Sequence, residues 1–384
     1  MTESTSTTGT GWRPRIWSAV ARIPLWALVV LAILLLFAAT AWGLLRPIIR
    51  ERQAIQRLEG YPDVKVFGGS FTKPTVYVCG FSGYSALQPS VWGKAVARLT
   101  GDGTWQPEDV TVYLRRGTPT RALGELTSLR QIGEINLVGR QWTDRDLAFV
   151  VDTLRMKRLT LSRTSMTANG LKALENRSFE ELDVSEQPIG PEFFRAVRSM
   201  TRLKSLSLKG DLFAVSDLSL LAGQPRMSSL WIECEDLASN SIEVFATLPE
   251  LTELYLDGSG IDDVFLRELG RLPKIVSLSV ADTKITDVGL ASIPASVHLE
   301  TLNVDQTAIT EAGLLSLKAV PKTLSLVGTK VQVTEPLKRW FLSHSFDEVA
   351  LDESQLDPTS PTADELSSHI GFLNITPAPF STGE

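Results

Sequence analysis

The residue types that carry out acid–base or metal chemistry are scarce in this 384-residue sequence and form no catalytic motif. Three histidines occur, at His298, His344 and His369. None of them belongs to a Ser/His/Asp arrangement or to a metal-ligand spacing. The carboxylates of Asp183, Glu233 and Asp257 could in principle act as an acid and a base, but surface acids are usually solvated charges. We therefore predict that the protein is not an enzyme and uses neither a cofactor nor a metal.

Two aromatic residues with acidic neighbours are better candidates for binding a partner. Trp231 and Tyr255 lie 24 residues apart, and Glu233, Glu253 and Asp257 each lie two residues from one of them. Aromatic side chains supply much of the energy at recognition surfaces, and carboxylates favour a basic or amine-bearing partner. The predicted partner-binding residues are Trp231, Tyr255, Glu233, Glu253, Asp257 and Asp183. The alternative is that the two aromatic rings only pair across strands and stabilise a sheet.

These residues belong to a repeat that runs through most of the chain. Two apolar residues separated by one other residue recur at intervals of 22 to 25 residues. The copies are Ile135/Leu137, Leu159/Leu161, Leu182/Val184, Leu206/Leu208, Leu230/Ile232, Leu254/Leu256, Leu278/Val280, Leu302/Val304, Leu324/Leu326 and Val349/Leu351. In most copies, apolar residues also recur three positions before the pair and seven, twelve and fifteen positions after its first member. Such regularity indicates a repeat architecture.

Each repeat predicts one strand and one helix. The alternating apolar pair is typical of a short strand with one buried face, and the later apolar positions are typical of the inner stripe of a short helix. One unit cannot bury its own apolar face, so the units must stack. Ten strands at a spacing of about 4.8 Å give a parallel sheet roughly 45 Å long. We predict an α/β solenoid over residues 110–357, with the sheet on its concave face and the helices on its convex face.

A six-residue phrase marks the corner of the repeat. Residues 285–290 read ITDVGL and residues 309–314 read ITEAGL. The threonine hydroxyl can cap the start of a helix, and the acid in the first turn suits the helix dipole. The glycine leaves room for close packing or for an unusual backbone angle. The phrase is therefore predicted to be structural.

The consensus L-x-x-L-x-L-x-x-T-x-I-T-D-x-G-L-x-x-L resembles the leucine-rich repeat family over about residues 110–357. The usual Asn or Cys after the strand is replaced by a hydroxyl residue, at Thr164, Thr283, Thr307, Thr329 and Ser259. A hydroxyl can still bond to the turning backbone. Elsewhere this position holds Arg140, Gln187, Asp211 and Glu235. We therefore predict that the ladder of turn hydrogen bonds along the repeats is interrupted there. The T-D-x-G-L variant looks like bacterial membrane-anchored members, and the resemblance implies a protein–protein interaction module.

An uncharged stretch, residues 23–45, precedes the repeats. As a helix it would span about 34 Å, enough to cross a bilayer, and Trp26 and Trp42 lie near its ends as interfacial aromatics do. A cleaved signal peptide is the alternative, because residues 39–41 (ATA) resemble a cleavage site. The apolar run continues past that site to Leu45, which favours an uncleaved, single-pass transmembrane helix.

Three arginines precede the stretch and four follow it within residues 46–57, so they give almost no orientation bias. A short N-terminal tail favours an extracytoplasmic repeat domain.

The remaining segments are assigned by composition. Residues 1–22 are predicted to be a disordered tail, 46–60 a juxtamembrane helix, 61–109 an N-terminal cap region and 358–384 an acidic, Pro/Ser-rich tail. Residues 1–57 carry about +5 of the net charge of -6, so the rest of the chain is near -11, which argues against a nucleic-acid partner. Cys79 and Cys234 form no disulfide framework. The sequence predicts a membrane-anchored protein-binding solenoid; a self-associating envelope protein without a specific ligand is the alternative.

Overall fold

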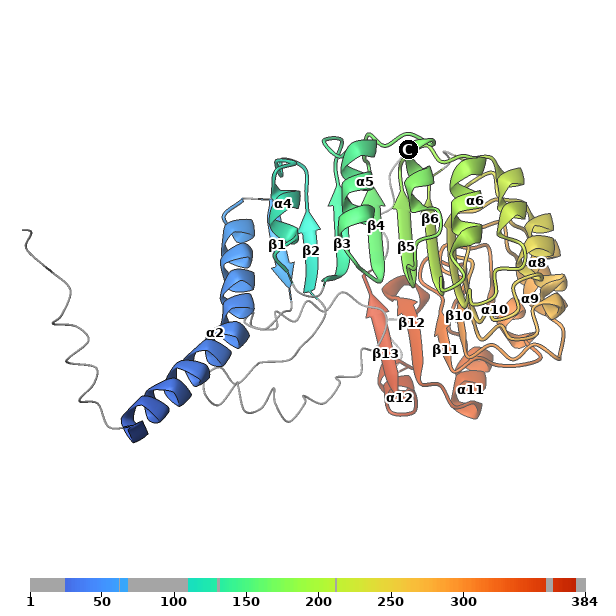
Figure 1. The fold of residues 1–384 in the computed structure, drawn as a ribbon. Helices are drawn as coiled ribbons and strands as arrows, with labels where there is room; N and C mark the ends of the chain where they lie inside the picture. The colour runs from blue at the N-terminus through green and yellow to red at the C-terminus, as the bar shows by residue number, and fades with distance from the viewer. Residues whose placement is uncertain are drawn as a thin grey trace, which may run out of the picture.

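The computed structural model describes residues 25–61, 63–67, 110–129, 132–210, 213–356 and 362–377. Within these ranges, thirteen strands form one sheet in which they follow one another in chain order. β1 (Val64–Phe67) is antiparallel to β2 (Val110–Leu114), whereas every later neighbouring pair is parallel. Figure 1 shows the strands following an arc, with the helices on its outer side.

The remaining strands are β3 (Ile132–Val138), β4 (Arg158–Ser162), β5 (Glu181–Ser185), β6 (Ser205–Lys209), β7 (Ser229–Glu233), β8 (Glu253–Tyr255), β9 (Ser277–Ser279), β10 (Thr301–Asn303), β11 (Thr323–Ser325), β12 (Glu348–Asp352) and β13 (Phe372–Thr376). The α-helices are α2 (Leu25–Glu59), α4 (Ala122–Leu126), α5 (Asp144–Thr153), α6 (Pro191–Ser199), α7 (Ile242–Phe245), α8 (Asp263–Arg267), α9 (Asp287–Ser292), α10 (Glu311–Leu315), α11 (Glu335–Ser343) and α12 (Thr362–Ser367). Short 3-10 helices are η1 (Gly170–Leu174), η2 (Val215–Leu221), η3 (Ser239–Ser241), η4 (Leu269–Arg271) and η5 (Glu353–Gln355).

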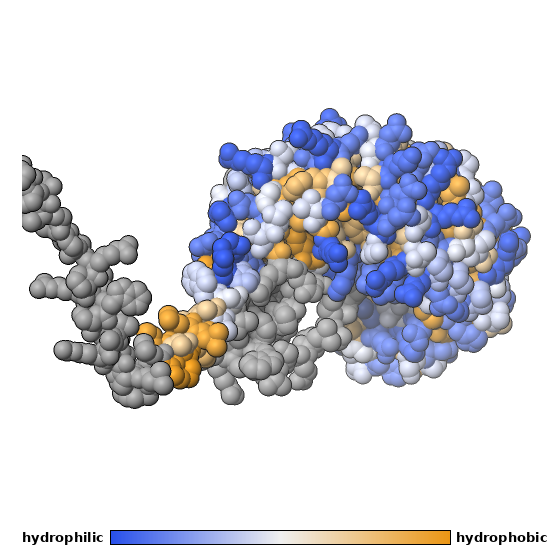
Figure 2. Space-filling view, in the orientation of Figure 1, coloured by the Kyte–Doolittle hydropathy of each residue, from blue (hydrophilic) through white to orange (hydrophobic). Residues whose placement is uncertain are grey.

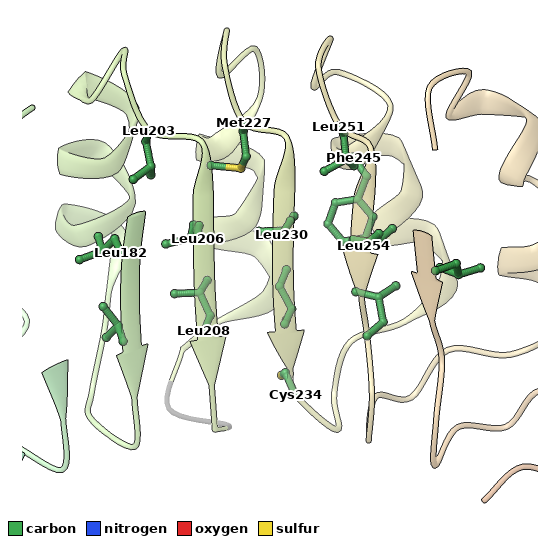
Figure 3. Close-up of a cluster of buried hydrophobic side chains, with 14 of the residues drawn as sticks. Leu182, Leu203, Leu206, Leu208, Met227, Leu230, Cys234, Phe245, Leu251 and Leu254 are labelled. Carbon is green, nitrogen blue, oxygen red and sulfur yellow. The ribbon is translucent and has the colours of Figure 1, made fainter. Parts of the chain in front are cut away.

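The repeated apolar pair forms a continuous buried spine. Leu206, Leu230 and Leu254 are register partners on successive strands, and each side chain is fully buried. Figure 3 shows these leucines side by side, with Leu203 and Met227 above the neighbouring strands. The predicted leucine-rich-repeat type of α/β solenoid is confirmed, because the parallel register places equivalent positions of each repeat next to one another.

The corner phrase connects each repeat to the next through its acid. The Asp263 carboxylate accepts hydrogen bonds from the Thr286 backbone N–H (2.7 Å) and from the Thr286 hydroxyl (2.6 Å). Asp287 accepts the same pair of bonds from Thr310. The Thr286 hydroxyl in turn accepts from Val288 N–H, so the predicted helix cap is confirmed. The acid therefore does more than suit the helix dipole, because it links consecutive repeats.

The glycine of the phrase makes room for that acid. A Cβ atom added to Gly289 would overlap the Asp263 carboxylate, and one added to Gly313 would overlap the Asp287 carboxylate. Neither glycine has a positive φ angle, so close packing is the reason for glycine here. The earlier repeat with Asp144 and Gly170 shows the same relationship.

The hydroxyl residues after the strands form the predicted turn bonds. The hydroxyls of Thr283, Thr307 and Thr329 each donate to the carbonyl oxygen three residues earlier, at 2.6–2.7 Å. Ser259 does the same with Leu256. At the predicted interruption, the buried side chain of Gln187 accepts a hydrogen bond from the Thr164 hydroxyl and so continues the ladder by one more repeat.

A single helix caps the N-terminal end of the solenoid. α2 joins the predicted elements 23–45 and 46–60, and it contains Pro47. A proline inside a helix removes a backbone hydrogen bond and kinks the helix, and Figure 1 shows α2 as two straight pieces that meet at an angle. Ala54, Ile55 and Leu58 are buried in the solenoid core next to β1 and α4. Of the cap region predicted at residues 61–109, the described part is β1 with the residues just before it, and α2 packs beside β1.

The first half of α2 exposes its apolar side chains. The large apolar residues between Val29 and Phe37 are 47–73% exposed. Figure 2 shows this half as an apolar surface outside the body of the solenoid. Within the part of the chain that the structure describes, no helix is both long enough and apolar enough to cross a membrane. The transmembrane assignment of residues 23–45 stays a prediction.

The C-terminal segment differs from the predicted loose tail, because the solenoid extends beyond residue 357. α12 and β13 follow β12, and Leu373 and Ile375 are register partners of Val349 and Leu351. The pair arises from one further 24-residue interval of the repeat, which the acidic and Pro-rich composition of the segment obscured. Buried Leu366 on α12 completes this extra unit.

Several predicted segments lie outside the described residues. They are the N-terminal tail 1–22, residues 23–24 of the apolar stretch, residues 68–109 of the cap region, residues 358–361 and 378–384 of the tail, Cys79 and Asp211.

The corner geometry predicts the effect of Gly289→Ala. The added methyl group must displace the Asp263 carboxylate, so we expect a loss of about 1–3 kcal/mol of unfolding free energy in urea titrations. The matched control is Gly124→Ala in α4, where a Cβ would meet nothing within 4 Å and where alanine favours the helix by up to about 1 kcal/mol. Combining Gly289→Ala with Asp263→Ala should cost less than the sum of the two changes. Simple additivity would contradict the proposed overlap.

Candidate binding surface on the concave sheet face

The middle outward residues of neighbouring strands lie side by side on the concave face. Ser207, Trp231, Tyr255 and Ser279 are register partners on β6, β7, β8 and β9. Their neighbours along each strand belong to the buried spine, so these side chains must point to the opposite face. The predicted adjacency of Trp231 and Tyr255 is therefore borne out by the sheet register.

The two aromatic rings stack on each other. Their centroids lie 5.2 Å apart and their planes are inclined by 27°. Lys209, from the preceding strand, places its ammonium nitrogen 4.2 Å from the centroid of the Trp231 ring. The Trp231 ring thus has an aromatic neighbour and a cation, an arrangement in which the electron-rich ring faces attract positive charge.

Tyr255 lies in a partly buried, acidic environment. Burial raises the pKa of the Tyr255 hydroxyl, a hydrogen bond with Ser277 opposes this shift, and the negative charges of Glu253 and Asp257 add to it. Each of these effects except the bond with Ser277 disfavours an additional negative charge at the ring. Of these effects, the negative charges of Glu253 and Asp257 are the ones that favour a positive group beside the ring.

The predicted carboxylates differ in what they do. Glu233 is exposed, and Glu253 is partly buried beside Tyr255. Asp257 instead accepts hydrogen bonds from the Ser279 hydroxyl (2.5 Å) and from the Ala281 backbone N–H (2.9 Å) on the next repeat. Asp257 therefore has a structural role, and one of its oxygens is already engaged by the sheet. Its negative charge still contributes to the surface.

Asp183 is further from the aromatic pair than the other predicted residues. It is the register partner of Ser207, which separates it from Trp231. Burial raises the pKa of the Asp183 carboxyl, and the nearby Lys209 ammonium partly opposes that shift. The Ser207 hydroxyl beside it also opposes the shift. On the next strand, the Trp231 Nε1 atom is buried and lacks a hydrogen-bond partner among the described residues.

The N-terminal half of the face carries its own cations, which the sequence-based analysis missed. Arg158 Nε lies 3.2 Å from Glu134 Oε2 and 4.0 Å from Glu181 Oε2, so it links three strands. Lys209 acts in a similar way beside Asp183 and Trp231. Both residues occupy outward positions that flank the middle one. Reading all three outward positions of each repeat, instead of the middle one alone, would have found them.

The structure also bears on the residues considered for catalysis. Asp183 and Asp257 belong to repeats three strands apart, about 14 Å at normal strand spacing, so they do not form an acid/base pair. His298 Nδ1 lies 3.1 Å from the Ser296 carbonyl oxygen, and His344 Nδ1 lies 2.9 Å from that of Trp340. In the ranges the structure describes, no group of three or more His, Cys, Asp or Glu residues could hold a metal ion.

Comparisons with known proteins find similarity only among solved structures. No protein-family model matches the chain, and no curated protein matches it. A structure of the Toll–Spatzle complex from Drosophila matches with 13% identity and a TM-score of 0.45, covering 70% of this chain but 37% of that one. The internalin InlF of Listeria monocytogenes matches with 15% identity and a TM-score of 0.42, covering 74% and 93% of the two chains. Internalin C2 of the same organism matches with 17% identity and a TM-score of 0.34, covering 67% and 92%.

The buried position of the Asp183 carboxyl predicts a pH-dependent effect of Asp183→Asn. A raised pKa means that the folded protein holds the proton more tightly than the unfolded chain, so the ionised group costs stability at neutral pH. We expect Asp183→Asn to be more stable than the natural protein at pH 7. The difference should shrink as the pH falls through the raised pKa of Asp183 and should be lost below about 3.9, where the unfolded carboxyl is also protonated. Urea titrations across this range measure it; a variant that is less stable at neutral pH would contradict the expectation.

Proposed function

We propose that this protein binds another protein through the concave face of its sheet, with the stacked Trp231 and Tyr255 rings at the centre of the contact. The observation that carries the proposal is the stacked pair, which stands on the open face with a buried indole N–H that has no partner in the described chain. A buried donor without an acceptor costs free energy that a partner's carbonyl or carboxylate oxygen could recover. Aromatic residues of this kind dominate the energetics of protein interfaces.

The architecture supports the same function. A solenoid has a large exposed sheet face, since only the spine face of each strand is buried against the helices. The predicted alternative is self-association without a specific ligand. The cross-linking experiment described next distinguishes it from binding of another protein.

The central prediction concerns the double variant Trp231→Ala/Tyr255→Ala. A photo-cross-linking amino acid at Ser279, next to Tyr255, should form an adduct with a different protein in cells that express the natural chain. The double variant should lose this adduct while it keeps a cooperative thermal unfolding transition, because each aromatic anchor contributes on the order of 2 kcal/mol or more to binding.

Two controls sharpen this experiment. Phe149→Ala removes an exposed aromatic ring from α5 on the opposite side of the sheet and should leave the adduct unchanged. Trp231→Phe keeps a stacking ring but removes the unpaired N–H, so it should give an intermediate yield. Adducts only between copies of this chain would support self-association, and an undiminished adduct in the double variant would end the proposal.

We further propose that the first half of α2 attaches the solenoid to a membrane, with the repeat domain on the extracytoplasmic side. The uncharged stretch of residues 23–45 supports this proposal, as do the exposed apolar side chains between Val29 and Phe37, which include consecutive residues and therefore point in every direction around the helix. Such a surface is unfavourable in water and favourable in lipid. Because the second half of the same helix caps the solenoid, attachment would hold the repeats at a short, fixed distance from the bilayer.

Membrane attachment predicts a clear fractionation result. The natural chain should remain in the membrane pellet after an alkaline carbonate wash, whereas Leu34→Arg/Leu35→Arg should release it, because a charge at the centre of a bilayer is costly. Protease added to intact cells should cleave the natural chain if the repeats face outward. A natural chain that is found in the supernatant would refute attachment, and protection in intact cells with cleavage after lysis would refute the orientation.

A further inference from the structure

The two halves of the concave face differ in charge. On the repeats of β8 to β12, five of the fifteen outward positions are acidic and none is Lys or Arg. The acidic residues are Glu253, Asp257, Asp305, Glu348 and Asp352. The half from β3 to β7 contains Arg158 and Lys209 among its acids and partly neutralises itself. Negative charge is therefore stronger in the C-terminal half, where none of the outward positions carries a cation.

The hydrogen bonds of this half do not remove that charge. Asp305 Oδ1 accepts hydrogen bonds from the Ser325 hydroxyl and the Val327 backbone N–H, both at 2.7 Å. Asp257 accepts the equivalent bonds two strands earlier in the sheet. Burial raises the pKa of Asp305, and the charges of Asp257 and Asp352 raise it further, while the two hydrogen bonds oppose this. The carboxylates thus repel one another across the sheet, and a cation placed over them would relieve that repulsion.

The shape of the face changes next to Tyr255. The outward positions of β9 are Ser277, Ser279 and Ala281, all small, whereas the β8 repeat presents Glu253, Tyr255 and Asp257. β8 therefore forms a step above a floor of small side chains. Tyr255 stands at this step, with Glu253 two residues before it and Asp257 two residues after it.

The other side of the aromatic pair shows how such a step can hold a cation. There, Lys209 lies with its ammonium nitrogen 4.2 Å from the Trp231 ring centroid, and the small residue Ser207 is the register partner of Trp231. Lys209 is the register partner of Glu233, yet its ammonium group lies over the Trp231 ring. The protein itself thus places a cation on the Trp231 side of the pair and provides none on the Tyr255 side.

We propose that the C-terminal half of the concave face docks a basic segment of the partner protein, with one Lys or Arg side chain seated against Tyr255 between Glu253 and Asp257. The rest of the segment crosses β9 to β12 toward Glu348. This inference rests on the proposed function and adds the chemistry of the partner and the half of the sheet that receives it. Cation–π attraction and complementary charge act together here, as they do between Lys209 and the other ring.

The test uses octalysine and octaglutamate peptides as probes, titrated calorimetrically into the full chain in detergent at two salt concentrations. Octalysine should bind, and more weakly at the higher salt concentration, whereas octaglutamate should not bind. Glu253→Gln/Glu348→Gln should weaken octalysine binding about tenfold, since two charge contacts are lost. Tyr255→Leu should weaken it by a further few-fold, and Tyr255→Phe should not.

A matched control separates a docking site from net charge. Glu134→Gln/Glu181→Gln removes the same number of charges from the same face but from β3 and β5, and it should change octalysine binding less than twofold. Equal weakening by the two double variants, or no binding of octalysine by the natural chain, would overturn the inference.

The results also distinguish this inference from the proposed function. If the cross-linked partner is lost in Trp231→Ala/Tyr255→Ala but kept in Glu253→Gln/Glu348→Gln, the protein binds a partner there and the basic segment is refuted. If octalysine binding behaves as expected while the cross-link to another protein is unchanged in Trp231→Ala/Tyr255→Ala, the cation-binding surface is upheld and the proposed function fails.

Discussion

The whole structure depends on one constraint: a single repeat cannot bury its own apolar face. Leu206, Leu230 and Leu254 become inaccessible to water only because neighbouring repeats lie in register on both sides. Because burial of apolar area is the dominant favourable term in folding, the repeats are stable only as a stack. The corner bonds between Asp263 and Thr286 then hold consecutive repeats in that register, and the glycine of the next repeat leaves space for the acid.

This constraint also decides where recognition can occur. The spine and the helices use one face of the sheet, so the opposite face is left to side chains that lie outside the apolar spine. Their types vary from repeat to repeat while the backbone stays the same. The N-terminal half offsets part of its negative charge with Arg158 and Lys209, whereas no outward position of the C-terminal half carries a cation. A uniform scaffold thereby carries two electrostatically different surfaces, with the stacked pair of Trp231 and Tyr255 at their boundary.

The first and last repeats have a neighbour on one side only, so their apolar core must be covered in another way. At the N-terminal end, Ala54, Ile55 and Leu58 of α2 cover the core, so the same helix that exposes the apolar side chains near Val29 also closes the solenoid. At the C-terminal end, β13 is the last strand, and Phe372 at its start is 60% exposed. Among the described residues, the two ends therefore differ, since a helix covers one and the strand β13 ends the other.

The sequence by itself determined the period, the strand positions, the buried spine and the adjacency of Trp231 and Tyr255, because each follows from which positions are apolar. It also held the last repeat, since Leu373 and Ile375 follow Val349 and Leu351 after 24 residues, although the composition around them hid it. Only the tertiary structure decided that Lys209 lies over Trp231 and that Asp257 bonds to the next repeat. Periodicity fixes the face on which a side chain stands, but its direction on that face depends on neighbours about 4.8 Å away that are some 24 residues distant in the chain.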